Sequence, residues 1–215
     1  MKYSTVIFDL DGTLLDTLDD LADAANAALT AHGYPARTRE EVCAFVGNGV
    51  RKLIERAIPG GADNPDCEAV LADFKTAYNA CCRNKTAPYP GVVELLSRLR
   101  DGGVRIAVVS NKFDAAVRAL CTHYFGDLVP VAVGECDNVR KKPAPDAVFE
   151  ALRRLGATAD TAVYVGDSDV DILTARNAGL PCISVTWGFR TAGFLTAHGA
   201  DVLTDTPDAL CGLIR

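Results

Sequence analysis

Short apolar runs rich in valine and isoleucine recur along the chain, and segments with a helical hydrophobic period separate most of them. Five such runs are predicted to be strands, at residues 5–8, 104–109, 128–133, 162–165 and 182–185. Continuous apolar runs of this length are typical of strands covered on both faces, as in a parallel sheet. Helical patterns occupy residues 92–100, 114–124, 146–155, 169–178 and 207–214. Strands that alternate with helices predict an α/β fold with a doubly wound, Rossmann-like parallel sheet.

Residues 16–88 interrupt this alternation, because they show helical patterns throughout and no convincing strand. We therefore expect a helical cap domain inserted after the first strand. In this division, residues 1–15 and 89–215 form the α/β core, and residues 16–88 form the helical cap. The breaker sequence Pro-Tyr-Pro-Gly at 88–91 is expected to mark the return of the chain to the core.

Helix starts within this insert are indicated by three local signals. Thr17-x-x-Asp20 and Thr38-x-x-Glu41 have the spacing of a capping box, in which the first and last side chains satisfy each other's backbone N–H groups. Asn64-Pro65 offers an N-cap and a first-turn proline for a long helix.

Composition and charge limit the classes of partner. The chain has 215 residues, 49% of them hydrophobic, which is enough for a core domain and a smaller accessory domain. Its 22 basic and 28 acidic residues give a formal net charge of -6, without a basic block that could neutralise a phosphate backbone. Nucleic acid is therefore not expected as a partner, whereas small phosphorylated molecules remain candidates.

Targeting signals and cysteine usage suggest a cytoplasmic protein. The first apolar stretch is interrupted by an aspartate at position 9 and has no small-residue cleavage site, so no secretory signal is expected. No run approaches the roughly 18 to 20 apolar residues of a membrane helix, so no membrane partner is expected. The eight cysteines are scattered, with no C-x-x-C and no paired histidines for zinc. We expect reduced, mostly buried thiols.

Polar and charged side chains gather directly after several predicted strands. The first strand ends at Asp9 and Asp11, within the sequence IFDLDGT. Comparable positions belong to Ser110 and Asn111 in VVSNK, to Asp167, Asp169 and Asp171 in VGDSDVD, and to Lys141 and Lys142 before a Pro-x-Pro turn. Ligands of an open parallel sheet bind beyond the carboxyl ends of its strands. The sequence therefore predicts that these clusters converge on one crevice.

Each cluster alone has a simpler explanation. Aspartate and asparagine near strand ends often form turns or helix N-caps, and Asp169 fits such a cap. The joint arrangement differs, because two unit charges about 4 Å apart repel by on the order of 4 kcal/mol at an effective dielectric near 20. Several carboxylates in one site therefore require a cation, and oxygen ligands without His or Cys favour Mg²⁺. A carboxylate, a metal, a lysine and a hydroxyl-amide pair are the groups that phosphoryl transfer uses.

Four motifs carry a resemblance to a known family. FDLDGT, VSN, KKPAPD and VGDSDVD, in this order, resemble the motifs of the haloacid dehalogenase superfamily of phosphatases, and the helical insert resembles that family's mobile cap. FVGNGV at 45–50, SNK at 110–112 and KKPAPD are similar to phosphoglycolate phosphatases, although pyrophosphatases and sugar-phosphate phosphatases share much of this pattern. The resemblance implies Mg²⁺-dependent hydrolysis of a small phosphate monoester, above all 2-phosphoglycolate, through an aspartyl-phosphate.

The resemblance also implies roles for the carboxylates and the lysine. Asp9 attacks phosphorus and binds Mg²⁺. Asp11 protonates the leaving oxygen and then deprotonates the attacking water, with its backbone carbonyl on the metal. Asp167 is the third protein ligand, and Asp171 holds metal-bound water. The family's lysine directly precedes its proline, which selects Lys142 over the lysine before it.

The remaining site residues concern the substrate. Ser110 and the Asn111 amide are expected to bind phosphate oxygens, and Gly12 is expected to let the backbone approach the phosphate closely. A Gly-x-Gly pattern in the insert by itself fits a turn between helices, whereas the resemblance indicates that it faces the substrate. The residues implied in the insert are Gly47, Asn48 and Gly49. Arg51 in the insert and Lys112 in the core are candidates to bind a substrate carboxylate.

Other functions share part of this pattern. A phosphomutase of the same superfamily would use the same aspartates but return the phosphoryl group to its sugar. The dehalogenase branch is disfavoured, because it lacks the acid two residues after the nucleophile, which is Asp11 here. A phospho-accepting receiver module also has strand-end aspartates, Mg²⁺ and a lysine, but it needs no helical insert. The sequence leaves open the physiological substrate and whether the protein is a monomer or a homodimer.

Overall fold

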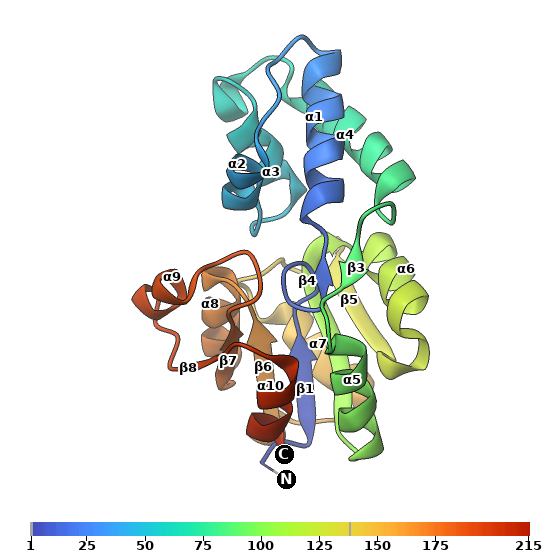
Figure 1. Ribbon diagram of the computed structural model, residues 1–215, viewed down its shortest axis with the longest axis vertical. Helices are drawn as coiled ribbons and strands as arrows, with labels where there is room; N and C mark the ends of the chain where they lie inside the picture. Colours follow the sequence, from blue (N-terminus) through green and yellow to red (C-terminus); the bar gives the residue numbers. More distant parts are fainter. Residues whose placement is uncertain (1, 138) are drawn as a thin grey trace. The chain divides into compact units, whose positions relative to one another are not determined.

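The computed structural model describes residues 2–137 and 139–215. The strands of its main sheet are β1 (Thr5–Phe8), β4 (Arg105–Phe113), β5 (Val131–Glu135), β6 (Ala162–Gly166), β7 (Cys182–Val185) and β8 (Val202–Thr204). In the described residues they form one six-stranded parallel sheet in the order β5-β4-β1-β6-β7-β8 (Figure 1). The chain starts in the middle of the sheet and extends it first to one side and then to the other. This is the doubly wound α/β arrangement that the sequence predicts.

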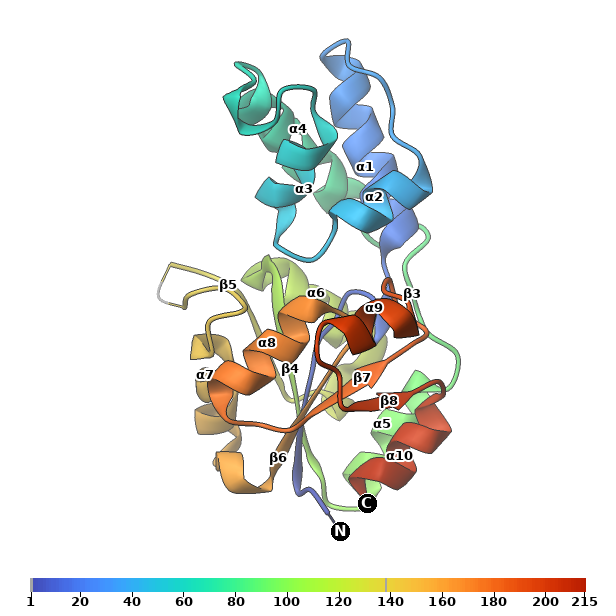
Figure 2. The same cartoon turned by 90° about the vertical axis from the view of Figure 1, so that its left-hand side faces the viewer.

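Helices cover both faces of this sheet (Figures 1 and 2). One face carries α5 (Val92–Asp101), α6 (Asp114–Phe125) and α10 (Pro207–Ile214), and the other carries α7 (Asp146–Leu155) and α8 (Asp169–Ala178). In β1, Val6 and Phe8 pack into the first layer and Ile7 packs into the second, and all three side chains are fully buried. A central strand with two covered faces needs apolar residues at every position, which explains the uninterrupted run in the sequence.

Two elements near the C-terminus were not predicted from the sequence. They are β8 and α9 (Ala192–Ala197). β8 is only three residues long, lies at the edge of the sheet, and leaves Val202 38% exposed. A short edge strand of this kind needs no continuous apolar run, so it gives only a weak signal in the sequence.

Residues Asp16–Ala87 form a compact unit of their own, separate from the unit formed by residues up to Leu15 and by Pro88–Arg215. This insert contains α1 (Leu18–Ala31), α2 (Arg39–Phe45), α3 (Val50–Ala57) and α4 (Cys67–Cys81). Within it, α1 packs on α4, and α3 contacts both α2 and α4. Where the chain passes between the units, β2 (Leu15–Asp16) and β3 (Ala87–Pro88) pair as a two-stranded sheet.

The capping signals of the insert had different outcomes. The capping box between Thr38 and Glu41 is confirmed, because each side chain accepts from the backbone N–H of the other. The one predicted at Thr17 is wrong, since Thr17 makes no side-chain cap hydrogen bond. The buried carboxylate of Asp20 instead accepts from the N–H and the hydroxyl of Thr86, at 2.9 and 2.7 Å. Asp20 therefore fixes the end of the insert to its first helix rather than capping that helix.

The start of α4 lies later than the sequence predicts. The helix begins at Cys67, and Asp66 takes the N-cap position that was expected for Asn64. The side-chain oxygen of Asn64 accepts from the N–H of Asp66 at 2.8 Å and from the hydroxyl of Tyr34 at 3.0 Å. Asn64 thus forms a turn that precedes the helix, which is the other common role of this residue type.

The cysteine thiols are less buried than the sequence predicts. All eight cysteines carry free thiols, but only Cys67, Cys121 and Cys211 are buried and Cys136 is exposed, so the prediction of mostly buried thiols is wrong. Among the described residues, no helix is both long enough and apolar enough to cross a membrane.

Candidate active site

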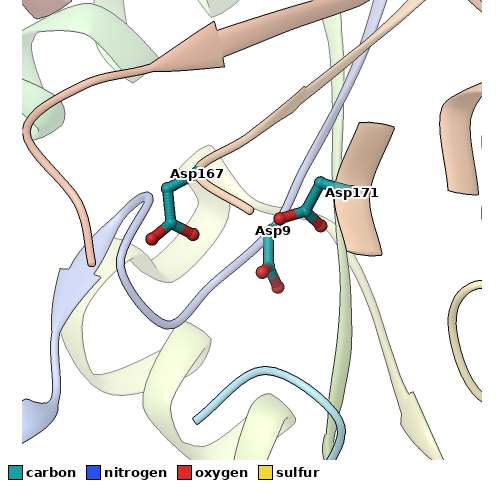
Figure 3. A group of neighbouring side chains, drawn as sticks. All are labelled: Asp9, Asp167 and Asp171. Carbon is teal, nitrogen blue, oxygen red and sulfur yellow. The ribbon is translucent and has the colours of Figure 1, made fainter. Parts of the chain in front are cut away.

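The carboxyl ends of β1, β4 and β6 lie side by side, because these strands are neighbours and run parallel. Asp9 directly follows β1, Ser110 lies in the last part of β4, Asp167 directly follows β6, and Asp171 lies in the first turn of α8. Figure 3 shows the side chains of the three aspartates Asp9, Asp167 and Asp171 gathered at this edge. The structure therefore brings together groups that are far apart in the sequence.

These three aspartates form a buried cluster that could hold a metal ion. One oxygen of each carboxylate lies within 4.8 Å of the others, and the residues Asp9, Asp167 and Asp171 are 8%, 2% and 0% exposed. The donor set consists of carboxylate oxygens alone, which suits a hard divalent cation such as Mg²⁺. The geometry and the chemistry of the cluster thus fit the ion that the sequence implies.

The cluster is electrostatically unfavourable without a cation. Burial, followed by the charge of Asp171, raises the pKa of Asp9 well above its usual value, against the opposing effect of Lys142. Burial and Asp171 likewise raise the pKa of Asp167 to about 7. Both shifts have the same origin, since buried carboxylates that repel one another resist ionisation. A bound divalent cation would remove this repulsion.

Lys142 is the cation that the chain itself places in the cluster. Its Nζ donates to Asp9 Oδ1 and to Asp171 Oδ1, both at 2.8 Å, and its side chain is 3% exposed. Burial opposes its charge, but Asp171 and Asp9 outweigh that effect and raise the pKa of Lys142. The neighbouring Lys141 is 43% exposed and lies 3.9 Å from Glu135, outside the cluster.

The backbone of Lys142 is held by Asn111. The side-chain amide of Asn111 donates to the carbonyl of Lys142 at 3.0 Å, and its oxygen accepts from the N–H of Lys142 at 2.7 Å. Both ends of this side chain are therefore used to connect β4 to the lysine segment. The contact between the Asn111 amide and phosphate stays a prediction.

Tyr164 is a site residue that the sequence analysis missed. Its hydroxyl accepts from Lys142 Nζ at 3.1 Å and donates to Asp171 Oδ1 at 3.0 Å, and its side chain is fully buried. Burial and the charge of Asp171 raise the pKa of Tyr164 well above its usual value, so the phenol keeps its proton. The only sequence signal was a polar atom inside the apolar run VYVG, where a buried hydroxyl must find a partner.

Asp171 also has a local structural role. Its Oδ2 accepts from the N–H and the hydroxyl of Ser168, at 3.1 and 2.5 Å, while the Ser168 hydroxyl accepts from the N–H of Asp171. This reciprocal capping box starts α8, so the N-cap is Ser168 and not Asp169 as expected. The helix start thereby fixes Asp171 with one oxygen directed to Lys142.

Asp167 is held in place by two neutral donors. The hydroxyl of Thr13 donates to one carboxylate oxygen at 3.3 Å, and the backbone N–H of Phe189 donates to the other at 2.7 Å. A Cβ on Gly12 would lie 2.3 Å from the second oxygen, and a Cβ on Gly188 would lie 2.5 Å from it. Gly12 also has φ of +80°, so both the backbone conformation and the close approach require glycine there. Gly188 carried no signal in the sequence.

Asp11 and Lys112 form an ion pair with each other. Lys112 Nζ lies 2.9 and 3.0 Å from the two carboxylate oxygens of Asp11, and the side chain of Lys112 is 2% exposed. The backbone N–H of Lys112 donates to the hydroxyl of Ser110 at 3.2 Å. The sequence predicts contacts with different parts of a substrate for these two charged residues and gives no sign that they contact each other.

The remaining predicted residues lie in the insert, in the turn between α2 and α3 and at the start of α3. Gly47 and Gly49 have φ of 129° and 85°, and Asn48 Oδ1 accepts from Arg56 at 2.7 Å. Arg51 forms a bidentate ion pair with Glu68, with Nη2 to Oε2 at 3.1 Å. These contacts lie within the insert itself, and the two glycines satisfy the backbone demands of a tight turn.

Known proteins resemble this chain over most of its length. Residues 6–185 match the model of the haloacid dehalogenase-like hydrolase family. A phosphoglycolate phosphatase of Pseudomonas putida is 35% identical over 98% of this chain and 76% of its own length. A Cupriavidus necator relative named phosphoglycolate phosphatase, plasmid, is 36% identical over 100% of this chain and 94% of its own length. A crystal structure from Lactobacillus delbrueckii superposes with a TM-score of 0.95 and 39% identity, covering 100% of this chain and 99% of that one. The chain therefore belongs to the haloacid dehalogenase-like hydrolase family.

Proposed function

We propose that this protein is a Mg²⁺-dependent phosphatase that hydrolyses a small phosphate monoester, above all 2-phosphoglycolate. The observation that carries the proposal is the buried cluster of Asp9, Asp167 and Asp171 at the carboxyl edge of the sheet, in which Lys142 pairs with Asp9 and Asp171. The substrate is supported by the names of the Pseudomonas putida and Cupriavidus necator relatives, which cover nearly the whole chain.

In this mechanism Asp9 is the nucleophile. Its Oδ1 accepts from the N–H of Leu10 at 2.7 Å and from Lys142 at 2.8 Å, which fixes the carboxylate and selects Oδ2 as the attacking atom. As the Asp9–phosphorus bond forms, the bond from phosphorus to the ester oxygen breaks, and Asp11 gives its proton to the departing alcohol. A water molecule then attacks phosphorus and passes a proton to Asp11, while the bond to Asp9 breaks and releases phosphate.

The metal would be held by Asp9, Asp167 and the backbone carbonyl of Asp11, with Asp171 on metal-bound water. When bound, Mg²⁺ supplies charge neutralisation for the phosphate and for the carboxylates around it. Lys142 adds a second positive charge beside the nucleophile.

Phosphate oxygens would be bound at the end of β4. We assign them to the hydroxyl of Ser110 and the main-chain N–H of Asn111. Glycine at position 12 leaves room for the carboxylate of Asp167 next to the backbone, because the Cβ of any larger residue would collide with that carboxylate. Lys112 is the core's candidate for a carboxylate on the substrate.

We further propose that the insert contributes to substrate choice through Gly47, Asn48, Gly49 and Arg51. Arg51→Ala should then raise KM and lower kcat for 2-phosphoglycolate, with much less effect on an aryl phosphate. Glu68→Ala is the matched control, since it removes the partner of Arg51 but keeps the guanidinium. Equal losses on both substrates would assign these residues to folding of the insert.

The proposal is tested by phosphate release from a panel of esters with the purified protein in Mg²⁺. The panel contains 2-phosphoglycolate, a hexose phosphate, pyrophosphate and an aryl phosphate, and a chelator provides the control. A preference for pyrophosphate or hexose phosphate would move the substrate class within the family. Retention of a labelled phosphoryl group in an isomerised hexose phosphate would indicate a mutase. A stable phosphoprotein without turnover would indicate a receiver module.

Cytoplasmic location and a monomeric or homodimeric state stay predictions.

A further inference from the structure

The carboxylate of Asp11, which acts as acid and base in the proposed mechanism, is held in an ion pair with Lys112. Both carboxylate oxygens of Asp11 lie within 3.0 Å of Lys112 Nζ. Lys112 is 2% exposed and Asp11 is 15% exposed, so little water screens the pair. While this contact persists, both oxygens face the ammonium, and Asp11 has to leave it before it can face an ester oxygen.

Lys112 lies close to the proposed phosphate site at the end of β4. The pairing of β4 with β5 is irregular between Val109 and Phe113, and within this stretch the backbone N–H of Lys112 donates to the hydroxyl of Ser110 at 3.2 Å. The side chain of Asn111 contacts Lys142, whereas that of Lys112 contacts Asp11. A phosphate bound at Ser110 would therefore bring a nearby second charge of the same substrate toward Lys112.

We propose that Lys112 selects substrates with a second negative charge by exchanging its ion-pair partner. The carboxylate of a small phosphorylated acid takes the ammonium, and this exchange leaves Asp11 able to turn to the ester oxygen. The inference rests on the phosphatase function proposed above and adds the reason why an acidic substrate is preferred. The specificity residue is thus coupled to the acid-base residue through one ion pair.

The energetics favour exchange over simple opening of the pair. When a substrate carboxylate replaces the carboxylate of Asp11, one close ion pair is traded for another, and the buried ammonium never loses its partner. A substrate without a second charge offers no replacement, so opening the pair costs the buried ammonium its contact with the carboxylate of Asp11. Acidic substrates should therefore reach the reactive arrangement more easily than neutral ones of the same size.

The first test compares 2-phosphoglycolate with 2-phosphoglycolamide, in which a neutral carboxamide replaces the carboxylate, on wild type and on Lys112→Met. Methionine keeps an unbranched buried side chain but removes the charge. Wild type should favour the acid by about tenfold or more in kcat/KM, and the variant should lose this preference. The amide should be hydrolysed several-fold faster by Lys112→Met than by wild type, because Asp11 no longer has to leave the lysine.

Controls separate this role from a purely structural one. Lys141→Met changes an exposed lysine outside the cluster and should keep the wild-type preference. Lys112→Arg keeps the charge and should restore part of the preference. If Lys112→Met slows the amide as much as the acid, the lysine only maintains the structure and the proposal is overturned.

A second test avoids dependence on one variant. Asp11→Asn removes the competing carboxylate, so calorimetric titration should show about tenfold tighter binding of 3-phosphonopropionate, a non-hydrolysable acid, than in wild type. Binding of 3-phosphonopropanamide, in which a neutral carboxamide replaces the carboxylate, should change little. Equal binding of the acid to both proteins would overturn the exchange. If wild type hydrolyses phosphate esters without distinguishing acid from amide, the inference fails while the phosphatase function stands; if it hydrolyses none, the proposed function itself fails.

Discussion

Replacing Lys142 by alanine is expected to lower the free energy of unfolding by about 3–5 kcal/mol near neutral pH, because it leaves buried carboxylates without their ammonium partner. Lys142 Nζ lies 2.8 Å from Asp9 and 2.8 Å from Asp171, and its side chain is 3% exposed. Lys141 is the matched control, since it is 43% exposed and 3.9 Å from Glu135. An exposed pair contributes at most about 1 kcal/mol, so the two alanine variants should differ by at least about 2 kcal/mol.

The loss should be smaller in acid. Burial and the charge of Asp171 raise the pKa of Asp9, and Lys142 opposes this rise. Without Lys142, the folded state would bind protons at Asp9 more readily than the unfolded state does. Stability of the variant should then fall as pH rises above the unfolded pKa, and it should recover as pH falls and the carboxyl becomes neutral.

Urea unfolding in the presence of a chelator, at about pH 5.5 and about pH 7.5, measures both effects, provided that the slopes of the transitions agree. A difference below about 1 kcal/mol between the two variants near neutral pH would refute the reasoning. So would a larger loss for Lys142→Ala in acid than near neutral pH. Phosphate release in Mg²⁺ gives an independent ranking, and a lower kcat/KM for Lys141→Ala than for Lys142→Ala would move the role to Lys141.

Four further predictions address the aspartates, the metal site and the glycine after Asp11. Asp9→Asn should abolish both turnover and formation of the phosphoenzyme. Asp11→Asn should accumulate the labelled phosphoryl group of an aryl phosphate on Asp9, because that leaving group needs little protonation. A labelled Asp9 variant would show that Asp9 is not the nucleophile. Chelation should stop hydrolysis, and full activity in verified metal-free protein would contradict the metal site. In metal-free protein the melting temperature should fall as pH rises from about 5.5 to 8, because burial raises the pKa of Asp167 to about 7 and this carboxyl then ionises in the folded state. Added Mg²⁺ should restore the melting temperature. A melting temperature that rises over this pH interval would argue against the cluster. Gly12→Ala should lower both the unfolding midpoint and kcat, since the added Cβ would lie 2.3 Å from an Asp167 oxygen at φ of +80°; wild-type values for both would show that the loop adapts.

The sequence by itself determined most elements of the core, β8 and α9 excepted, and the order of its chemical groups. The predicted ranges 182–185 and 146–155 coincide with β7 and α7. A strand buried on both faces needs a continuous apolar run, and α7 ends at Gly156, whose positive φ is the usual helix stop. These signals act over a few neighbouring residues, so a single sequence is enough to read them.

Local signals with two meanings gave the errors. Thr17-x-x-Asp20 has the spacing of a capping box, but the carboxylate of Asp20 binds Thr86, which lies 66 positions away in the sequence. Ser168 caps α8 where Asp169 was expected, because either residue type can take that position. Only the folded chain decides which of two suitable donors or acceptors is close enough.

The partners of the long buried side chains were decided by the tertiary structure alone. Lys112 meets Asp11 across 101 positions of sequence, and Tyr164 meets Lys142 across 22. The first contact exists because β1 and β4 are neighbours, and the second because Asn111 of β4 holds the segment of Lys142, so both form only when the sheet is assembled. The sequence predicted that aspartates and lysines would gather at this edge, since the carboxyl ends of parallel strands meet there. It could not assign each charge to its partner, because the pairing of buried charges depends on distances between elements that no local pattern records.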